Sequence, residues 1–186
     1  CIADLTQVLA DPTVDIVDIC LPPHLHLQAC LDALDAGKVV ICEKPLVGSL
    51  READLLAAKV RETDGFLSPV FQYRFGLGTA QLGALMAAGL AGKAYAATLE
   101  THWDIHDLLT SILGPVDRVF AELSTRVNPV ETEDCAALTL RMASGAVATS
   151  SVTLGAAGNM SRLRVMFEGV TVTSDTDAYA PATGGW

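Results

Sequence analysis

The chain of 186 residues is long enough for one large domain or two small ones, and 51% of its residues are hydrophobic, which predicts a packed globule and excludes disorder. Its net charge is −10, and no cluster of Lys and Arg exceeds two adjacent residues, which argues against nucleic acid and anionic membranes as partners. No apolar run approaches the ~20 residues of a membrane-spanning helix, so a soluble protein is expected. The five cysteines are odd in number and form no C-x-x-C pair, which favours a reduced, cytosolic setting.

The first half of the chain predicts alternating helices and strands. An amphipathic helix is expected at 4–10, a buried strand at 15–21, a helix at 24–36 and a second strand at 39–42. Pro22 and Pro23 end the first strand because proline lacks the backbone donor that a sheet requires, and Gly37 stands where a left-handed helix C-cap belongs. Strand, helix and parallel strand within about 30 residues form a βαβ unit. Ligands of such sheets collect at the carboxyl ends of the strands, where Leu21-Pro22-Pro23 and Glu43-Lys44-Pro45 both lie.

The rest of the chain is predicted in the same way. Ser49 and Glu52 have the spacing of a capping box, so a helix is expected over 50–62, and the next strand over 66–71 with its tail running on to residue 75. A helix at 79–89 and a short connector follow. Beyond it we expect a strand at 94–103, a helix at 105–113, and strands at 116–125, 135–142, 147–154, 162–168 and 170–173. These strands are joined by short turns, which is typical of a β-meander.

Two segments carry a resemblance to a known family. Leu-Pro-Pro-His-Leu-His at 21–26 and Ala-Gly-Lys-Val-Val-Ile-Cys-Glu-Lys-Pro-Leu at 36–46 resemble the core signature of the Gfo/Idh/MocA oxidoreductases, the family of glucose–fructose oxidoreductase and inositol dehydrogenase. The resemblance implies that residues 1–75 are the C-terminal part of an α/β, Rossmann-type parallel sheet that binds NAD(P). It implies that residues 76–186 are an α+β substrate and oligomerisation domain with a large, mostly antiparallel sheet.

The same resemblance implies an incomplete chain. The first βαβ unit of the Rossmann domain, with its G-x-G-x-x-G fingerprint, is expected before residue 1. A loop is expected to be missing near 103–105, and the C-terminus is expected to be missing as well.

The resemblance also implies site residues. Lys44 is expected to polarise or protonate the alcohol oxygen during hydride transfer, with Pro45 bending the chain to aim it, a cis bond being one means. Contacts with the cofactor are expected from Leu21, Pro22, Pro23, His26, Glu43, Lys44, Pro45 and Arg74. The alternatives are structural: Lys44 and Glu43 as solvated residues at a strand end, His26 as a cap of the first helical turn, and Arg74 as a partner in a surface salt bridge.

A second catalytic region of the family has the form D-x-G-x-H-x-x-D. When Asp107 is aligned with its final aspartate, Asp104 falls where histidine is expected and Glu100 where aspartate is expected. Either the aspartate–histidine pair is lost, or it belongs to the missing loop. His106 and Asp107 are then the candidate catalytic residues within the chain.

These features predict an NAD- or NADP-dependent oxidoreductase that moves hydride between the nicotinamide and a secondary alcohol of a sugar, inositol or related polyol. The expected setting is cytoplasmic and the expected assembly a homo-oligomer through the sheet domain. The alternative is a non-catalytic relative of the same fold that senses a dinucleotide or a sugar. A purely structural domain is a weaker third reading, and no metal site is indicated, since the histidines lack a third and fourth ligand at zinc spacing.

Overall fold

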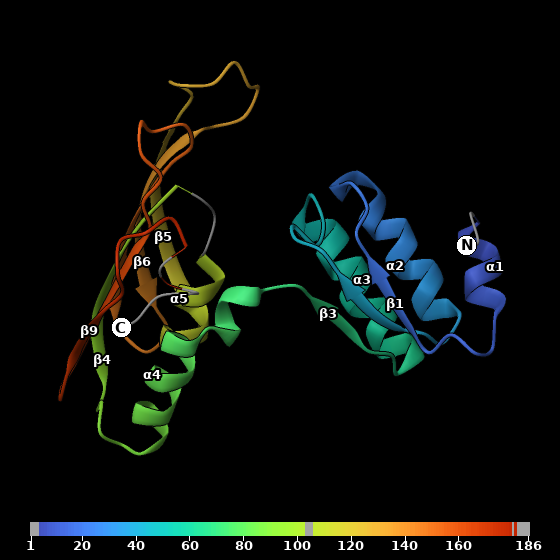
Figure 1. Ribbon diagram of the computed structural model, residues 1–186, viewed down its shortest axis with the longest axis horizontal. Coiled ribbons are helices and arrows are strands. Elements are labelled where there is room, and N and C mark those ends of the chain that lie inside the picture. Colours follow the sequence, from blue (N-terminus) through green and yellow to red (C-terminus); the bar gives the residue numbers. More distant parts are fainter. Residues whose placement is uncertain (1–3, 103–105, 180, 182–186) are drawn as a thin grey trace. The chain divides into compact units, whose positions relative to one another are not determined.

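The computed structural model describes residues 4–102, 106–179 and 181. The chain forms two compact units, residues 1–71 and residues 72–186. Figure 1 shows the first in blue to green and the second in green to red. Each unit has a sheet and a hydrophobic core of its own.

The first unit is a three-stranded parallel sheet with helices on it. Its elements are α1 (Leu5–Ala10), β1 (Ile16–Ile19), the 3-10 helix η1 (Pro23–Leu25), α2 (His26–Asp35), β2 (Val39–Cys42), α3 (Leu50–Thr63) and β3 (Leu67–Pro69), and the strand order is β1-β2-β3. Side chains from α2 and α3 share one core with Val40 and Cys42 of the central strand, so both helices pack on the same face. The predicted βαβ unit is therefore confirmed.

Local signals in this unit act as predicted. Gly37 has a φ of +69°, its N–H donates to the carbonyl of Leu34, and the N–H of Lys38 donates to that of Ala33, which is a Schellman motif at the end of α2. The Ser49 hydroxyl accepts from the N–H of Glu52 at 3.3 Å, and the Glu52 carboxylate accepts from the N–H of Gly48 at 2.9 Å. The end of α2 and the start of α3 are therefore fixed by residues close in sequence.

The segment after β3 differs from the prediction. The tail of this strand was expected to run to Phe75, but the chain leaves the sheet and Gln72–Phe75 forms the 3-10 helix η2. Tyr73 turns into the core of the second unit, where it is 8% exposed, and its carbonyl accepts from the Thr79 hydroxyl. Burying this ring stabilises the turn over a continued strand.

The described part of the second unit is a six-stranded sheet with α4 and α5 on one face. After η2 come α4 (Leu77–Ala87), β4 (Ala94–Thr101), α5 (His106–Leu113), β5 (Val116–Ser124), β6 (Cys135–Met142), β7 (Val147–Thr153), β8 (Arg162–Phe167) and β9 (Thr171–Thr173). The strand order is β5-β6-β7-β4-β8-β9, and every neighbouring pair is antiparallel except β4 with β7. The large, mostly antiparallel sheet is confirmed. A plain meander is wrong, because β4 lies between β7 and β8.

One face of this sheet forms the core. Leu99, Leu140 and Leu163 point from three strands toward Leu82 of α4 and Leu109 of α5, and all five are at most 5% exposed. The alternate residues of the same strands, such as Thr98, Thr139 and Arg164, are exposed. The helices therefore lie on one face only (Figure 1).

Candidate functional site

Two loops of the first unit meet at the carboxyl ends of neighbouring strands. Ile19 of β1 lies opposite Cys42 of β2, so the Leu21-Pro22-Pro23 turn and the Glu43-Lys44-Pro45 segment leave the sheet side by side. The Leu21 side chain and both prolines are exposed, while Glu43 and Lys44 are half-buried. The sheet thus brings together an apolar turn, a carboxylate and an ammonium group.

Two hydrogen bonds hold the backbone at Glu43 and Lys44. The N–H of Glu43 donates to the carbonyl of Ile19 at 3.0 Å, which continues the strand ladder to the residue before Lys44. The Glu43 carboxylate accepts from the N–H of Lys44 at 3.1 Å, and the Lys44–Pro45 peptide bond is cis. Glu43 therefore contacts the Lys44 backbone, and its contact with a cofactor stays a prediction.

His26 lies between the two loops, and its expected contact with a cofactor stays a prediction. It is the first residue of α2 and is 0% exposed. Its Nε2 lies 2.7 Å from the carbonyl oxygen of Leu21, and its Nδ1 lies 2.9 Å from that of Pro45. Both polar atoms of the ring thus face the backbone of the two loops, and a direct bond to a cofactor would require one of these contacts to open.

The pKa values of Cys20 and Cys42 argue against either as a nucleophile. Burial, followed by the neighbouring Cys30, raises the pKa of the Cys42 thiol to about 12. Partial desolvation, and then the charges of Asp18 and Glu43, also raise the pKa of the Cys20 thiol, although this residue is exposed. Since the thiolate is the reactive form, these groups stay protonated and inert at neutral pH.

In the second unit, Arg74 forms an ion pair with Asp107. The Arg74 Nε donates to Oδ2 of Asp107 at 2.7 Å and its Nη2 donates to Oδ1, a bidentate pair that joins η2 to α5. The Asp107 carboxylate raises the pKa of Arg74 through these bonds. Arg74 is therefore a salt-bridge partner, which was the structural alternative to a cofactor contact. A contact between Arg74 and a cofactor stays a prediction.

His106 lies one residue earlier, at the start of α5. Its Nε2 is 2.9 Å from the hydroxyl of Ser150, which is buried on β7. The expected missing loop near 103–105 lies outside the described residues, as does Asp104 at the aligned position of the histidine, whereas Glu100, His106 and Asp107 are described.

Sequence reasoning missed a polar cluster at the end of β4. The Thr101 hydroxyl lies 3.1 Å from that of Ser161, and Nδ1 of His102 lies 3.2 Å from the same Ser161 oxygen. Thr101 and His102, together with Glu100, line a cavity of about 210 Å³. The sequence gives no signal for it, because Ser161 is 59 residues away from His102 along the chain.

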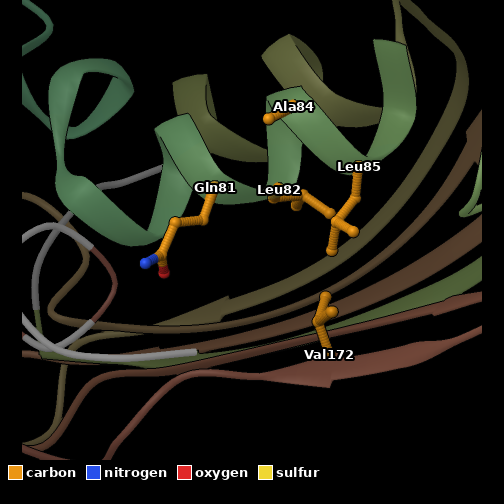
Figure 2. A pocket seen from close by; sticks show the side chains of 5 residues that line it. All are labelled: Gln81, Leu82, Ala84, Leu85 and Val172. Atoms are coloured by element: carbon orange, nitrogen blue, oxygen red, sulfur yellow. The ribbon is translucent and has the colours of Figure 1, made fainter. Parts of the chain in front are cut away.

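A larger cavity, of about 450 Å³, lies between α4 and the sheet. Figure 2 shows Leu82 and Leu85 of the helix pointing toward Val172 of β9, with Gln81 at one end. The described residues that line this cavity are apolar apart from Gln81, and none of them has a titratable side chain.

Two searches of the described residues bear on other classes of site. Within 4–102, 106–179 and 181, no group of three or more His, Cys, Asp or Glu side chains is placed to hold a metal ion. Over that same part of the chain, none of the helices combines the length and apolarity needed to cross a membrane.

Comparison with known proteins agrees with this geometry. Residues 1–71 match the family described as oxidoreductase family, NAD-binding Rossmann fold, and residues 101–173 match the GFO/IDH/MocA C-terminal domain. Levoglucosan dehydrogenase of Pseudarthrobacter phenanthrenivorans is 35% identical over 72 residues, which are 39% of this chain and 18% of that protein. The scyllo-inositol 2-dehydrogenase (NAD(+)) of Bacillus subtilis is 36% identical over 90 residues, 48% of this chain and 26% of that protein.

A solved structure shares the fold over nearly the whole chain. An NAD binding oxidoreductase from Klebsiella pneumoniae superposes with a TM-score of 0.86 at 23% identity, over 94% of this chain and 57% of that one. This chain therefore spans only part of the length of its relatives. With both of its units matched to the two domains of one family, the chain belongs to the Gfo/Idh/MocA oxidoreductases.

Proposed function

We propose that this chain is part of an NAD- or NADP-dependent oxidoreductase that moves hydride between the nicotinamide and a secondary alcohol of a sugar, inositol or related polyol. The observation that carries the proposal is the position of Lys44, directly after β2 and the bond from the N–H of Glu43 to Ile19, beside the exposed Leu21-Pro22-Pro23 turn. The printed functions of levoglucosan dehydrogenase and scyllo-inositol 2-dehydrogenase support the substrate class.

The residues at this edge fit a dinucleotide. Ligands of parallel sheets lie outside the carboxyl ends of the strands, and Leu21, Pro22 and Pro23 offer an exposed apolar surface there. The Glu43 carboxylate could accept from ribose hydroxyls while it orients the Lys44 backbone. When bound, the nicotinamide accepts or supplies the hydride, and the protein supplies placement and charge.

Lys44 then acts on the substrate oxygen. Its ammonium donates a hydrogen bond to the alcohol or carbonyl oxygen and stabilises the negative charge that develops there as hydride moves. His106 and Asp107 are the remaining catalytic candidates, with the Asp107 carboxylate held by Arg74 and His106 held by Ser150.

A non-catalytic sensor is the second candidate. It is favoured by the engagement of both His106 and Asp107 in bonds to other side chains within the second unit. A sensor would bind NAD(H) or a sugar and give no turnover.

The test is NAD(P)+ reduction by the protein across a panel of sugars and inositols, with dinucleotide binding measured in parallel. Lys44→Ala is expected to lower kcat roughly 10²- to 10⁴-fold, the usual contribution of a general acid or base. Lys93→Ala, which changes an exposed lysine of the second unit, is the matched control. Binding without turnover in the unsubstituted protein would favour the sensor, and an unchanged kcat for Lys44→Ala would refute the role of this lysine.

We also propose that the protein forms a homo-oligomer through the open face of its large sheet. Phe120 and Val147 are exposed on that face, where a second copy of the chain would cover them. Light scattering after size-exclusion chromatography tests this, with Phe120→Asp expected to lower the mass of the particle.

The cytoplasmic setting is proposed on the state of the cysteines. Cys20, Cys30, Cys42 and Cys135 are all free thiols, as expected in a reducing compartment. Cell fractionation followed by detection of the protein tests it.

A further inference from the structure

We propose that His26 is a positioning residue, which aims Lys44 by holding the carbonyl of Pro45. The inference rests on the proposed function for its kinetic consequence, but the arrangement itself is independent of it. No contact between His26 and cofactor or substrate is required.

The backbone is held by a contact on either side of Lys44. On one side, the N–H of Glu43 is bonded to the carbonyl of Ile19 on the neighbouring strand at 3.0 Å. On the other side, the carbonyl of Pro45 lies 2.9 Å from Nδ1 of His26. Lys44 and its cis peptide bond thus lie between two fixed points, and only one of them belongs to the sheet.

The second anchor is rigid because of where the histidine lies. His26 is 0% exposed, so its ring is fixed by packing at the start of α2. Its Nε2 also faces the carbonyl of Leu21 at 2.7 Å, which ties the ring to the end of β1. The ring thus lies between the turn after β1 and the segment after β2, at the edge where the cofactor is proposed to bind; an imidazolium donates to both carbonyls, and a neutral ring with its N–H at Nδ1 donates to that of Pro45.

The two contacts of the His26 ring can be removed one at a time, because each involves a different ring nitrogen. Carbonyl oxygens only accept, so each contact is a hydrogen bond when the facing nitrogen carries a proton. An asparagine side chain places its amide nitrogen near the position of Nδ1, whereas glutamine places it near that of Nε2. His26→Asn can therefore retain the bond to Pro45, and His26→Gln the bond to Leu21.

The two variants give different predictions. His26→Gln is expected to lower kcat roughly 10- to 100-fold with the KM for the polyol nearly unchanged, because small misplacements of a catalytic group cost about that much. His26→Asn is expected to retain most of kcat. Thermal unfolding of both variants controls for stability, and His24→Asn, on an exposed histidine of the same segment, is the matched control.

A second readout does not depend on turnover. The rate at which an amine-acylating reagent modifies Lys44, followed by peptide mass spectrometry, is expected to change in His26→Gln and to stay the same in His26→Asn and His24→Asn. If the unsubstituted protein reduces no NAD(P)+, the proposed function fails and this measurement still decides the role of His26. Equal effects of the Asn and Gln variants on kcat or on the acylation rate would overturn the proposal, as would no effect of either.

Discussion

The ion pair between Arg74 and Asp107 allows a test of what Asp107 does. The pair is bidentate, yet the Arg74 side chain is 44% exposed and the Asp107 side chain 17%. Water therefore screens the guanidinium, and the desolvation that makes buried pairs costly to break is only partial. A double-mutant cycle of Arg74→Ala and Asp107→Ala is expected to give a coupling free energy of about 0.5–1 kcal/mol, the upper part of the range for exposed pairs.

The assay is urea unfolding of the four proteins in the cycle, followed by kinetics of the same set. A coupling of about 3 kcal/mol or more, as found for buried pairs, would refute the screening argument. If Asp107 only joins η2 to α5, Arg74→Ala and Asp107→Ala should lower kcat by similar factors, since either removes the same bond. A much larger loss for Asp107→Ala than for Arg74→Ala would show a role of the carboxylate beyond the pair.

Three further predictions concern stability. Gly37→Ala should destabilise the protein by about 1–2 kcal/mol in urea unfolding, because residue 37 has a φ of +69° and no atom near the added Cβ repays the backbone strain. Leu163→Ala should cost about 2–5 kcal/mol, because this side chain is 0% exposed in the core of the second unit, and a loss below 1 kcal/mol would contradict that packing. Asp134 accepts hydrogen bonds from the backbone N–H groups of residues 126–128, which hold its pKa below the ordinary 3.8. The stability that Asp134 contributes is therefore present above that value and lost as the pH falls through the lower folded pKa, so Asp134→Asn should flatten the acid side of the stability profile.

Much of the fold follows from residues that are close in sequence. The prolines at 22 and 23, Gly37, and the Ser49–Glu52 pair decide where helices start and stop, because their hydrogen bonds and backbone angles involve neighbours only a few residues away. The proximity of Leu21-Pro22-Pro23 to Glu43-Lys44-Pro45 was also predictable, since a βαβ unit must bring the ends of its two strands to one edge.

Other features depend on contacts between distant residues. Arg74 meets Asp107 across 33 residues, and the segment that contains Arg74 is a 3-10 helix because Tyr73 is buried in a core that later strands and helices build. The place of β4 between β7 and β8 likewise depends on which strand edges are left for pairing after the chain has turned back. Alternating hydrophobicity predicts that a segment is a strand, but it does not predict which other strand pairs with it.

His26 shows most clearly which features the sequence determined and which the tertiary structure decided. The sequence by itself placed this histidine beside the turn that ends the first strand, at the start of a helix. Only the tertiary structure decided that the ring is fully buried and that its second nitrogen faces the carbonyl of Pro45, 19 residues further on. The physical reason is that a side chain's hydrogen-bond partners are set by the packing of α2 against the sheet, which brings the segment after β2 to the ring.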